Sequence, residues 1–243
     1  HYIEIKINNF KILASNKKNK ISHALLKKCN FDDQSELEVI KKFSKIKKIF
    51  LLDCGCNYGF YSFFTASLSD QNLVIAIEGS PTTSKDFKKN LNLNKFDNIV
   101  LKNSAISNID DTTINFNESN NDWESSLTHN AFDEKKVSKV VTQKIDTIIK
   151  DQKLDKYLLL IKLDIEGHEL QALEGAKNTI EKYKPIIIIE LSTYIFYKND
   201  KAFDRFKSFL TEFNYSIYNT KKILTSLEDI IISIKSLDSE HET

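Results

Sequence analysis

The chain has 243 residues, with 35 lysine and arginine residues against 34 aspartate and glutamate residues, and a formal net charge of +1. Its 41% apolar and 28% charged residues are typical of a globular domain and argue against a disordered chain. The near-neutral balance argues against a dedicated nucleic-acid-binding protein, which usually carries a clear basic excess. No apolar run approaches the roughly 18 residues of a membrane helix, so we expect no membrane span.

Residues 1–14 alternate in the manner of β-strands, which predicts a small N-terminal hairpin. Residues 35–48 carry an apolar stripe at helical spacing and predict a helix. From residue 49 onward, strand-like apolar runs alternate with helical patterns. The predicted strands are 49–53, 73–78, 98–102, 113–116, 137–142, 157–163, 186–191 and 215–218, and the predicted helices are 58–67, 81–93, 168–183 and 202–213.

This alternation predicts an α/β fold with a mainly parallel central sheet. Ligands of such sheets bind beyond the carboxyl ends of the strands, so we expect the chemistry in the residues that follow each strand. The segment 103–135 is polar and irregular, and a polar insertion of this length is usually functional or disordered. We expect a hairpin extension over residues 1–34 and one main domain over residues 35–243.

The three cysteines, Cys29, Cys54 and Cys56, form no regular framework, and an odd count predicts a reducing compartment. Cys54 and Cys56 lack the C-x-x-C spacing of redox and zinc sites, so we expect buried thiols and name no metal-binding residues; whether a divalent metal is used stays open. The first residues show no basic-then-apolar leader pattern. Together these features predict a cytoplasmic protein.

The strand at 49–53 runs into DCGCNYG at 53–59, a D-x-G-x-N-x-G pattern that opens a helix. Tight strand-to-helix turns need left-handed backbone, which glycine tolerates best and asparagine next best. The dinucleotide pattern G-x-G-x-x-G is not matched, because Asn57 and Phe60 replace its second and third glycines. Since the second glycine lets the backbone approach a pyrophosphate, this turn favours a ligand without one.

The next strand, at 73–78, ends in Glu78. An acidic side chain at this place can accept hydrogen bonds from the ribose hydroxyls of an adenosine ligand. Nicotinamide-dependent enzymes share this feature, so Glu78 indicates adenosine and leaves the reaction open.

The strand at 157–163 leads into LIKLDIEGHE at 160–169. Lys162 and Asp164 share one face of the strand, and a charged pair inside an apolar run is costly unless it is paired or functional. Glu166 and His168 follow directly, and clustered titratable groups at a strand end are candidates for a functional site. The alternative is a capped helix, because acidic residues near a helix N-terminus stabilise its dipole.

Together these motifs resemble those of FkbM-type S-adenosylmethionine-dependent methyltransferases. The resemblance covers roughly residues 35–195, and IKLDIEGHELQALEGA at 161–176 contains its most specific part. The other matching pieces are DCGCNYG at 53–59, AIEGSP at 76–81, NLNLN at 90–94, NSAIS at 103–107, SSL at 125–127, QKIDTI at 143–148 and KPIIIIEL at 184–191. The chain departs from the family at Cys54 and Cys56, where small or aliphatic residues are usual, and at Gly79, where proline is usual.

The resemblance implies a class I methyltransferase (Rossmann-like) fold, with a seven-stranded sheet, one strand antiparallel, and helices on both faces. It implies S-adenosyl-L-methionine as cofactor and S-adenosyl-L-homocysteine as product. Glu78 would hold the ribose, Ser104 and Ala105 would lie beside the adenine, and Asp164 would face the cofactor's amino group or the reacting centre. The predicted cofactor-binding residues are Asp53, Gly55, Cys56, Asn57, Gly59, Glu78, Gly79, Ser104, Ala105 and Asp164.

The expected reaction is O-methylation of a hydroxyl on a carbohydrate-like, glycolipid or natural-product acceptor. Such a hydroxyl must lose its proton, and histidine is the usual base near neutral pH. We therefore expect His168 to act as the base, with Asp164 or Glu166 orienting the acceptor. The expected partner is a small molecule or a glycan, and the oligomeric state stays open.

Two other functions remain open. A nicotinamide-dependent oxidoreductase would share the glycine turn and Glu78, although the missing G-x-G-x-x-G pattern weighs against it. A non-catalytic module that binds an adenosine ligand would keep both features and transfer nothing. The methyltransferase and this module differ in activity rather than in fold.

Overall fold

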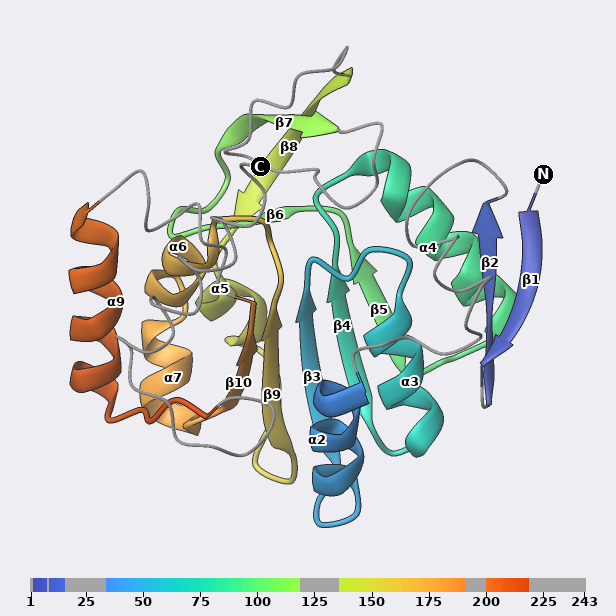
Figure 1. Ribbon diagram of the computed structural model, residues 1–243, viewed down its shortest axis with the longest axis horizontal. Helices are drawn as coiled ribbons and strands as arrows, with labels where there is room; N and C mark the ends of the chain where they lie inside the picture. Colours follow the sequence, from blue (N-terminus) through green and yellow to red (C-terminus); the bar gives the residue numbers. More distant parts are fainter. Residues whose placement is uncertain (1, 8, 16–33, 119–135, 191–199, 219–243) are drawn as a thin grey trace, which may run out of the picture. The chain divides into compact units, whose positions relative to one another are not determined.

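The computed structural model describes residues 2–7, 9–15, 34–118, 136–190 and 200–218 (Figure 1). Cys29 and the SSL motif at 125–127 lie outside the described residues. The chain divides into two compact units, 1–190 and 191–243. The second unit contains helix α9 (Asp200–Phe213), and the first contains every other described helix and strand. In the described part of the chain, no helix is long and apolar enough to cross a membrane.

The centre of the first unit is a five-stranded sheet in the order β10-β9-β3-β4-β5, in which every neighbouring pair is parallel. Its strands are β3 (Ile49–Cys54), β4 (Leu73–Ile77), β5 (Ile99–Lys102), β9 (Leu158–Leu163) and β10 (Ile186–Ile189). The middle strand, β3, is buried along its whole length, as expected of a parallel strand covered on both faces.

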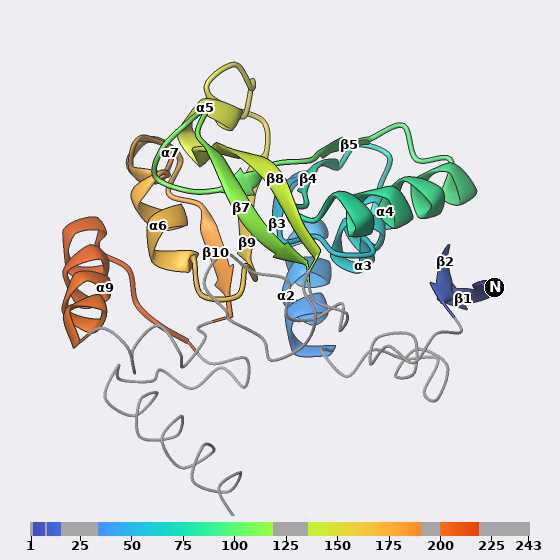
Figure 2. The same ribbon diagram turned by 90° about the horizontal axis from the view of Figure 1, so that it is seen from above.

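Among the described residues of the first unit, six helices accompany this sheet. They are α2 (Gln34–Ser44), α3 (Phe60–Leu68), α4 (Pro81–Asn94), α5 (Ile145–Ile149), α6 (Glu169–Glu174) and α7 (Lys177–Tyr183). From above, α3 and α4 lie toward the β4–β5 side and α6 and α7 toward the β9–β10 side (Figure 2). One core cluster joins the sheet to three helices through Leu51 of β3, Ile40 of α2, Phe63 of α3 and Phe87 of α4.

The predicted alternation of strands and helices and the parallel central sheet are confirmed. The predicted count of seven strands is not reached among the described residues, because three further strands form a sheet of their own. These are β6 (Ala105–Ile106), β7 (Thr113–Glu118) and β8 (Lys136–Gln143), in the order β6-β8-β7. The chain leaves the central sheet after β5 at Asn103, whose Nδ2 donates to the carbonyl oxygens of Glu78 and Gly79. The strand expected at 215–218 falls in the second unit, and of these four residues Tyr218 alone has strand-type bridging.

The predicted N-terminal hairpin is present as β1 (Tyr2–Ile7) paired antiparallel with β2 (Phe10–Ser15). The ring of Phe10 contacts those of Phe60 and Phe63, with centroids 5.9 and 6.2 Å away. Asn90 and Asn94 of α4 each accept a 2.7 Å hydrogen bond from the backbone of β2. The hairpin is therefore fastened to α3 and α4, and the division into residues 1–34 and 35–243 stays a prediction.

The helix predicted over 168–183 is interrupted, so that prediction was wrong in its continuity. The break lies at Gly175, where a Cβ atom would overlap the carbonyl oxygen of Ser107. The carboxylate of Asp146 then accepts hydrogen bonds from the backbone N–H groups of Asn178 and Thr179, at 3.1 and 2.7 Å. These bonds satisfy amide groups at the start of α7, which makes a second helix start favourable.

Candidate active site

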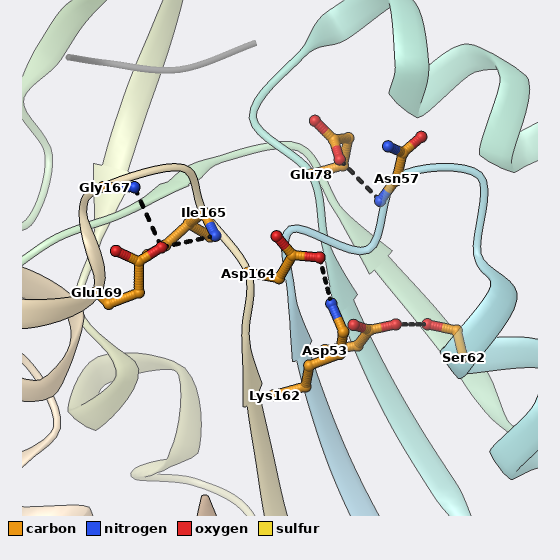
Figure 3. A network of polar contacts seen from close by, with 9 residues as sticks. All are labelled: Asp53, Asn57, Ser62, Glu78, Lys162, Asp164, Ile165, Gly167 and Glu169. Atoms are coloured by element: carbon orange, nitrogen blue, oxygen red, sulfur yellow. Dashed lines mark hydrogen bonds and ion pairs between the residues drawn. The ribbon is translucent and has the colours of Figure 1, made fainter. Parts of the chain in front are cut away.

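The carboxyl ends of β3, β4 and β9 bring Asp53, Asn57, Glu78 and Asp164 to one edge of the sheet (Figure 3). In the register of the sheet, Asp53 lies between Ala76 of β4 and Lys162 of β9. The turn at 53–59, the residues after β4 and the segment 162–169 therefore meet there, although they are far apart in the sequence.

The turn after β3 has left-handed backbone at three of its residues. The φ angles are 77° at Gly55, 50° at Asn57 and 95° at Gly59. A Cβ atom at Gly55 would overlap the carbonyl oxygen of Asp164, so the turn passes directly over the end of β9. The N–H groups of Gly55 and Cys56 both donate to the carbonyl oxygen of Ile77, at 2.9 and 3.0 Å. The turn is thus held against the ends of both neighbouring strands.

Asp53 is fully buried at the end of β3. Its Oδ2 accepts a 2.6 Å hydrogen bond from the hydroxyl of Ser62 on α3, whereas its Oδ1 has no hydrogen-bond partner. Burial raises the pKa of Asp53, and the nearby Lys162 ammonium works in the opposite direction. The carboxylate is therefore an orienting group below the turn, with one oxygen still able to accept a hydrogen bond.

Lys162 and Asp164 form an ion pair, with 2.9 Å between Nζ and Oδ2. The lysine side chain is 6% exposed and the aspartate side chain 34% exposed. The ammonium also lies 4.6 Å from the centroid of the Tyr61 ring. Burial alone would lower the pKa of Lys162, but the carboxylates of Asp164 and Asp53 outweigh it and raise that pKa. The lysine therefore stays charged inside the sheet edge, and Asp164 forms the outer end of the pair.

Glu78 lies directly after β4 and is buried. Its two carboxylate oxygens accept hydrogen bonds from backbone N–H groups, one from Asn57 at 2.9 Å and one from Ser80 at 2.8 Å. Burial raises the pKa of Glu78 to about 7, although both hydrogen bonds oppose the shift. The bond from Asn57 connects the carboxylate directly to the glycine turn.

The loop after β9 is held by Glu169, the first residue of α6. Its Oε1 accepts hydrogen bonds from the backbone N–H groups of Ile165 and Gly167, at 3.2 and 3.1 Å. The loop needs this support because Glu166 and Gly167 both have left-handed backbone, with φ of 53° and 99°. Burial raises the pKa of Glu169, whose Oε2 is buried without a hydrogen-bond partner.

His168 is the predicted base, and it lies at the N-terminal end of α6. Its Nε2 lies 3.5 Å from the hydroxyl of Ser107, and its Nδ1 is buried without a partner. Burial lowers the pKa of His168, so the ring is neutral near pH 7.

Four other predicted cofactor-binding residues, Cys56, Gly79, Ser104 and Ala105, follow the strands β3, β4 and β5 in the chain. Cys56 and Cys54 are buried free thiols, and burial raises the pKa of both. Gly79 lies against the ring of Phe116 on β7, which occupies the space that a Cβ atom would need. Ser104 donates a 3.1 Å hydrogen bond to Gln143 of β8, and Ala105 is buried in β6.

Sequence reasoning left three contacting residues out of the predicted site: Ser62, Lys162 and Glu169. Lys162 and Glu169 stand inside the motif already quoted; the sequence marked Lys162 as a charge beside Asp164 but gave it no role at the site. Ser62 lies nine residues after Asp53, on another element, and nothing in the local pattern marks it. Among the described residues, no group of three or more His, Cys, Asp or Glu side chains is arranged to hold a metal ion.

The edge therefore offers carboxylate oxygens to a ligand, with one ammonium group buried behind them. Such a set accepts hydrogen bonds from hydroxyl and ammonium groups and suits a ligand that carries positive charge. The two glycines of the turn let the backbone pack directly against the Asp164 carbonyl and the rings of Phe63 and Phe87, where a side chain would not fit.

Comparison with known proteins identifies the family. Residues 53–217, well over half of the chain, match the family model of the methyltransferase FkbM domain. The chain resembles the crystal structure of precorrin-6y C5,15-methyltransferase from Geobacter metallireducens GS-15 at 12% identity and a TM-score of 0.43, over 82% of this chain and 85% of that one. It resembles TYW2 of M. jannaschii, solved in complex with AdoMet, at 15% identity and a TM-score of 0.41, over 89% of this chain and 75% of that one. No curated protein matches the sequence. The match over residues 53–217 shows that this chain belongs to the FkbM methyltransferase family.

Proposed function

We propose that the protein is an S-adenosylmethionine-dependent methyltransferase that methylates a hydroxyl group of its acceptor. The observation that carries this proposal is the junction of the glycine turn with Glu78 through the 2.9 Å hydrogen bond from the Asn57 N–H group. It joins a turn able to take the methionine part of the cofactor to a carboxylate able to take the ribose. Family membership supports the same activity.

The residues around the turn fit S-adenosyl-L-methionine. Gly55 and Gly59 allow the left-handed backbone of the turn, and Asp53 at its start has an Oδ1 without a hydrogen-bond partner. Each oxygen of Glu78 has accepted one hydrogen bond and keeps a lone pair for a ribose hydroxyl. When bound, the cofactor supplies an activated methyl group and its own leaving group.

The chain itself then has to position the acceptor, exclude water and take up one proton. Asp164 is suited to contact a ligand, because its side chain is one third exposed and is fixed by Lys162. His168 is the candidate base, since its ring is neutral near pH 7. The roles predicted for Asp164 and Glu166, which are to orient the acceptor, stay predictions.

The acceptor we propose is a hydroxyl on a carbohydrate-like, glycolipid or natural-product molecule. The resemblance to FkbM-type methyltransferases supports this class. A panel of glycans, glycolipids and polyhydroxylated small molecules, assayed for transfer of a labelled methyl group, tests it. Transfer only to amines or thiols would contradict the hydroxyl assignment.

Calorimetric titration with S-adenosylhomocysteine tests cofactor binding, with NADH titrated in parallel. We expect a micromolar dissociation constant, about −8 kcal/mol, for S-adenosylhomocysteine and no binding of NADH. Glu78→Gln should weaken binding at least tenfold, whereas Glu181→Gln on the exposed side of α7 should leave it unchanged. Binding of NADH alone would favour the oxidoreductase. Binding of neither ligand would favour a non-catalytic protein that keeps the fold but binds no cofactor.

The role of His168 needs a separate experiment. His168→Ala should keep the affinity for S-adenosylhomocysteine and lose most of the turnover, because a base contributes about 10²-fold or more. A variant that retains both affinity and turnover would remove His168 from the mechanism.

A further inference from the structure

Lys162 is a buried charge that the proposed chemistry does not yet use. Of the lysines in the described part of the chain, it is the buried one. Charged groups face it from three strand ends: Asp53 near the end of β3, Asp164 after β9 and Glu190 after β10. The Tyr61 ring of α3 covers its ammonium group.

The geometry separates the contacts that hold the lysine in place from the contact through which the lysine fixes another side chain. Asp53 is its direct neighbour in the sheet register, and the Tyr61 ring stands 4.6 Å from Nζ. Both contacts come from rigid elements, so they hold the ammonium in one place. Its 2.9 Å bond to Asp164 Oδ2 then fixes a side chain that is otherwise one third exposed (Figure 3).

Lys162 does not reach a ligand itself, because its side chain is only 6% exposed. Asp164 does, and one of its two oxygens is taken by the lysine. A carboxylate with one oxygen fixed presents the other in a defined direction, and its best partner is a charged hydrogen-bond donor. In S-adenosylmethionine that donor is the ammonium group of the methionine part, since the sulfonium carries no hydrogen.

We propose that Lys162 is a positioning residue that aims Asp164 at the ammonium group of the cofactor's amino-acid part. The inference rests on the proposed function, since it names the group of that cofactor which Asp164 contacts. The Ser62–Asp53 pair and the Tyr61 ring form the support that keeps the lysine in place.

Two ligands separate this role from a general structural one. S-adenosylhomocysteine carries the ammonium group, whereas 5′-methylthioadenosine keeps the adenosine and the sulfur and lacks the amino-acid part. By calorimetry, Lys162→Met should bind S-adenosylhomocysteine at least about tenfold more weakly than the wild type, the usual effect of losing a charge-assisted hydrogen bond. Binding of methylthioadenosine should change less than about twofold, because that ligand does not use Asp164.

A double-mutant cycle tests whether the lysine acts through the aspartate. Asp164→Asn should weaken the affinity for S-adenosylhomocysteine by a similar factor. Adding Lys162→Met to this variant should weaken that affinity by no more than about another twofold. Lys89→Met, which breaks an exposed ion pair with Asp86 on α4, is the matched control and should bind both ligands like the wild type.

Several results would overturn the proposal. Equal losses for both ligands in Lys162→Met would make its role structural, and unchanged binding of S-adenosylhomocysteine would remove the role altogether. If Lys162→Met does not fold, Asp164→Asn decides: wild-type affinity for S-adenosylhomocysteine in that variant overturns the proposal. A wild type that binds both ligands equally well would refute this inference and leave the proposed function standing, whereas binding neither would refute the proposed function.

Discussion

Two buried carboxylates at the same edge of the sheet, Asp53 and Glu78, are compensated in different ways. Asp53 has a hydroxyl from Ser62 and faces the ammonium of Lys162, so its partners are side chains from other elements. Glu78 has two backbone N–H groups, one from the glycine turn and one from the start of α4.

This difference determines which substitutions can remove the partners of each carboxylate. The support of Asp53 includes a full charge and can be removed by a single substitution. The support of Glu78 is the backbone itself, which no side-chain substitution removes and which carries only partial charges. Burial raises the pKa of both carboxyls, and that of Glu78 reaches about 7, so protonation of Glu78 varies across the physiological range.

The largest expected effect on stability is that of Lys162→Met. Removing one partner of a buried ion pair leaves uncompensated charge, which costs about 3 kcal/mol of the free energy of unfolding. Lys89→Met, which breaks an exposed pair on α4, should cost less than about 0.5 kcal/mol. Urea unfolding of both variants measures the contrast. Similar losses in the two would mean that the buried cation is no more important than a surface one.

Glu78→Gln should change how stability depends on pH. In the folded protein the pKa of Glu78 is about 7, against an ordinary value of 4.5. The stability that protonated Glu78 provides is therefore fully present below about 4.5 and lost as the pH rises through 7. Glutamine has no such loss, so the stability of the variant relative to the wild type should rise by about 2 kcal/mol from pH 5 to pH 8. A difference that does not vary with pH would mean that burial of Glu78 is compensated at every pH.

Ser62→Ala tests the side-chain support of Asp53. The buried carboxylate would lose its 2.6 Å hydrogen bond, at an expected cost of about 1–2 kcal/mol. Ser67→Ala on the same helix removes only a bond to the Phe64 carbonyl near the surface and should cost less than about 0.5 kcal/mol. Equal losses in thermal unfolding would place the effect in the helix rather than in the contact with Asp53.

The parts of the fold that could be predicted from the sequence are those fixed by local pattern. The apolar runs of β3, β4 and β9 predicted the parallel sheet. Because ligands of such sheets bind beyond the carboxyl ends of the strands, the sequence also predicted the edge where Asp53, Glu78 and Asp164 meet. Both depend on residues close together in sequence or on the shared direction of the strands.

The parts that could not be predicted depend on contacts between distant segments. The break between α6 and α7 follows from the approach of the Ser107 backbone to Gly175, and the separate three-stranded sheet follows from the pairing of β6 with β8. The direction of the His168 ring depends on Ser107 in the same way. None of these contacts leaves a periodic signal in the sequence, because each joins one residue to a segment placed by the rest of the fold.

The smallest expected effect on stability concerns Gly79, the residue after Glu78, which packs against the ring of Phe116. A new Cβ atom at Gly55 would meet the backbone carbonyl of Asp164. At Gly79 it would instead meet the ring of Phe116 on β7, at 2.6 Å. Because a ring can shift where a carbonyl cannot, Gly79→Ala should cost only about 1 kcal/mol of the free energy of unfolding. In a Phe116→Leu background the same substitution should cost nothing further, so the two changes should be coupled by about the whole of that cost. Additive losses in the double variant would show that the backbone of Gly79, and not the ring above it, sets the size of the residue that follows Glu78.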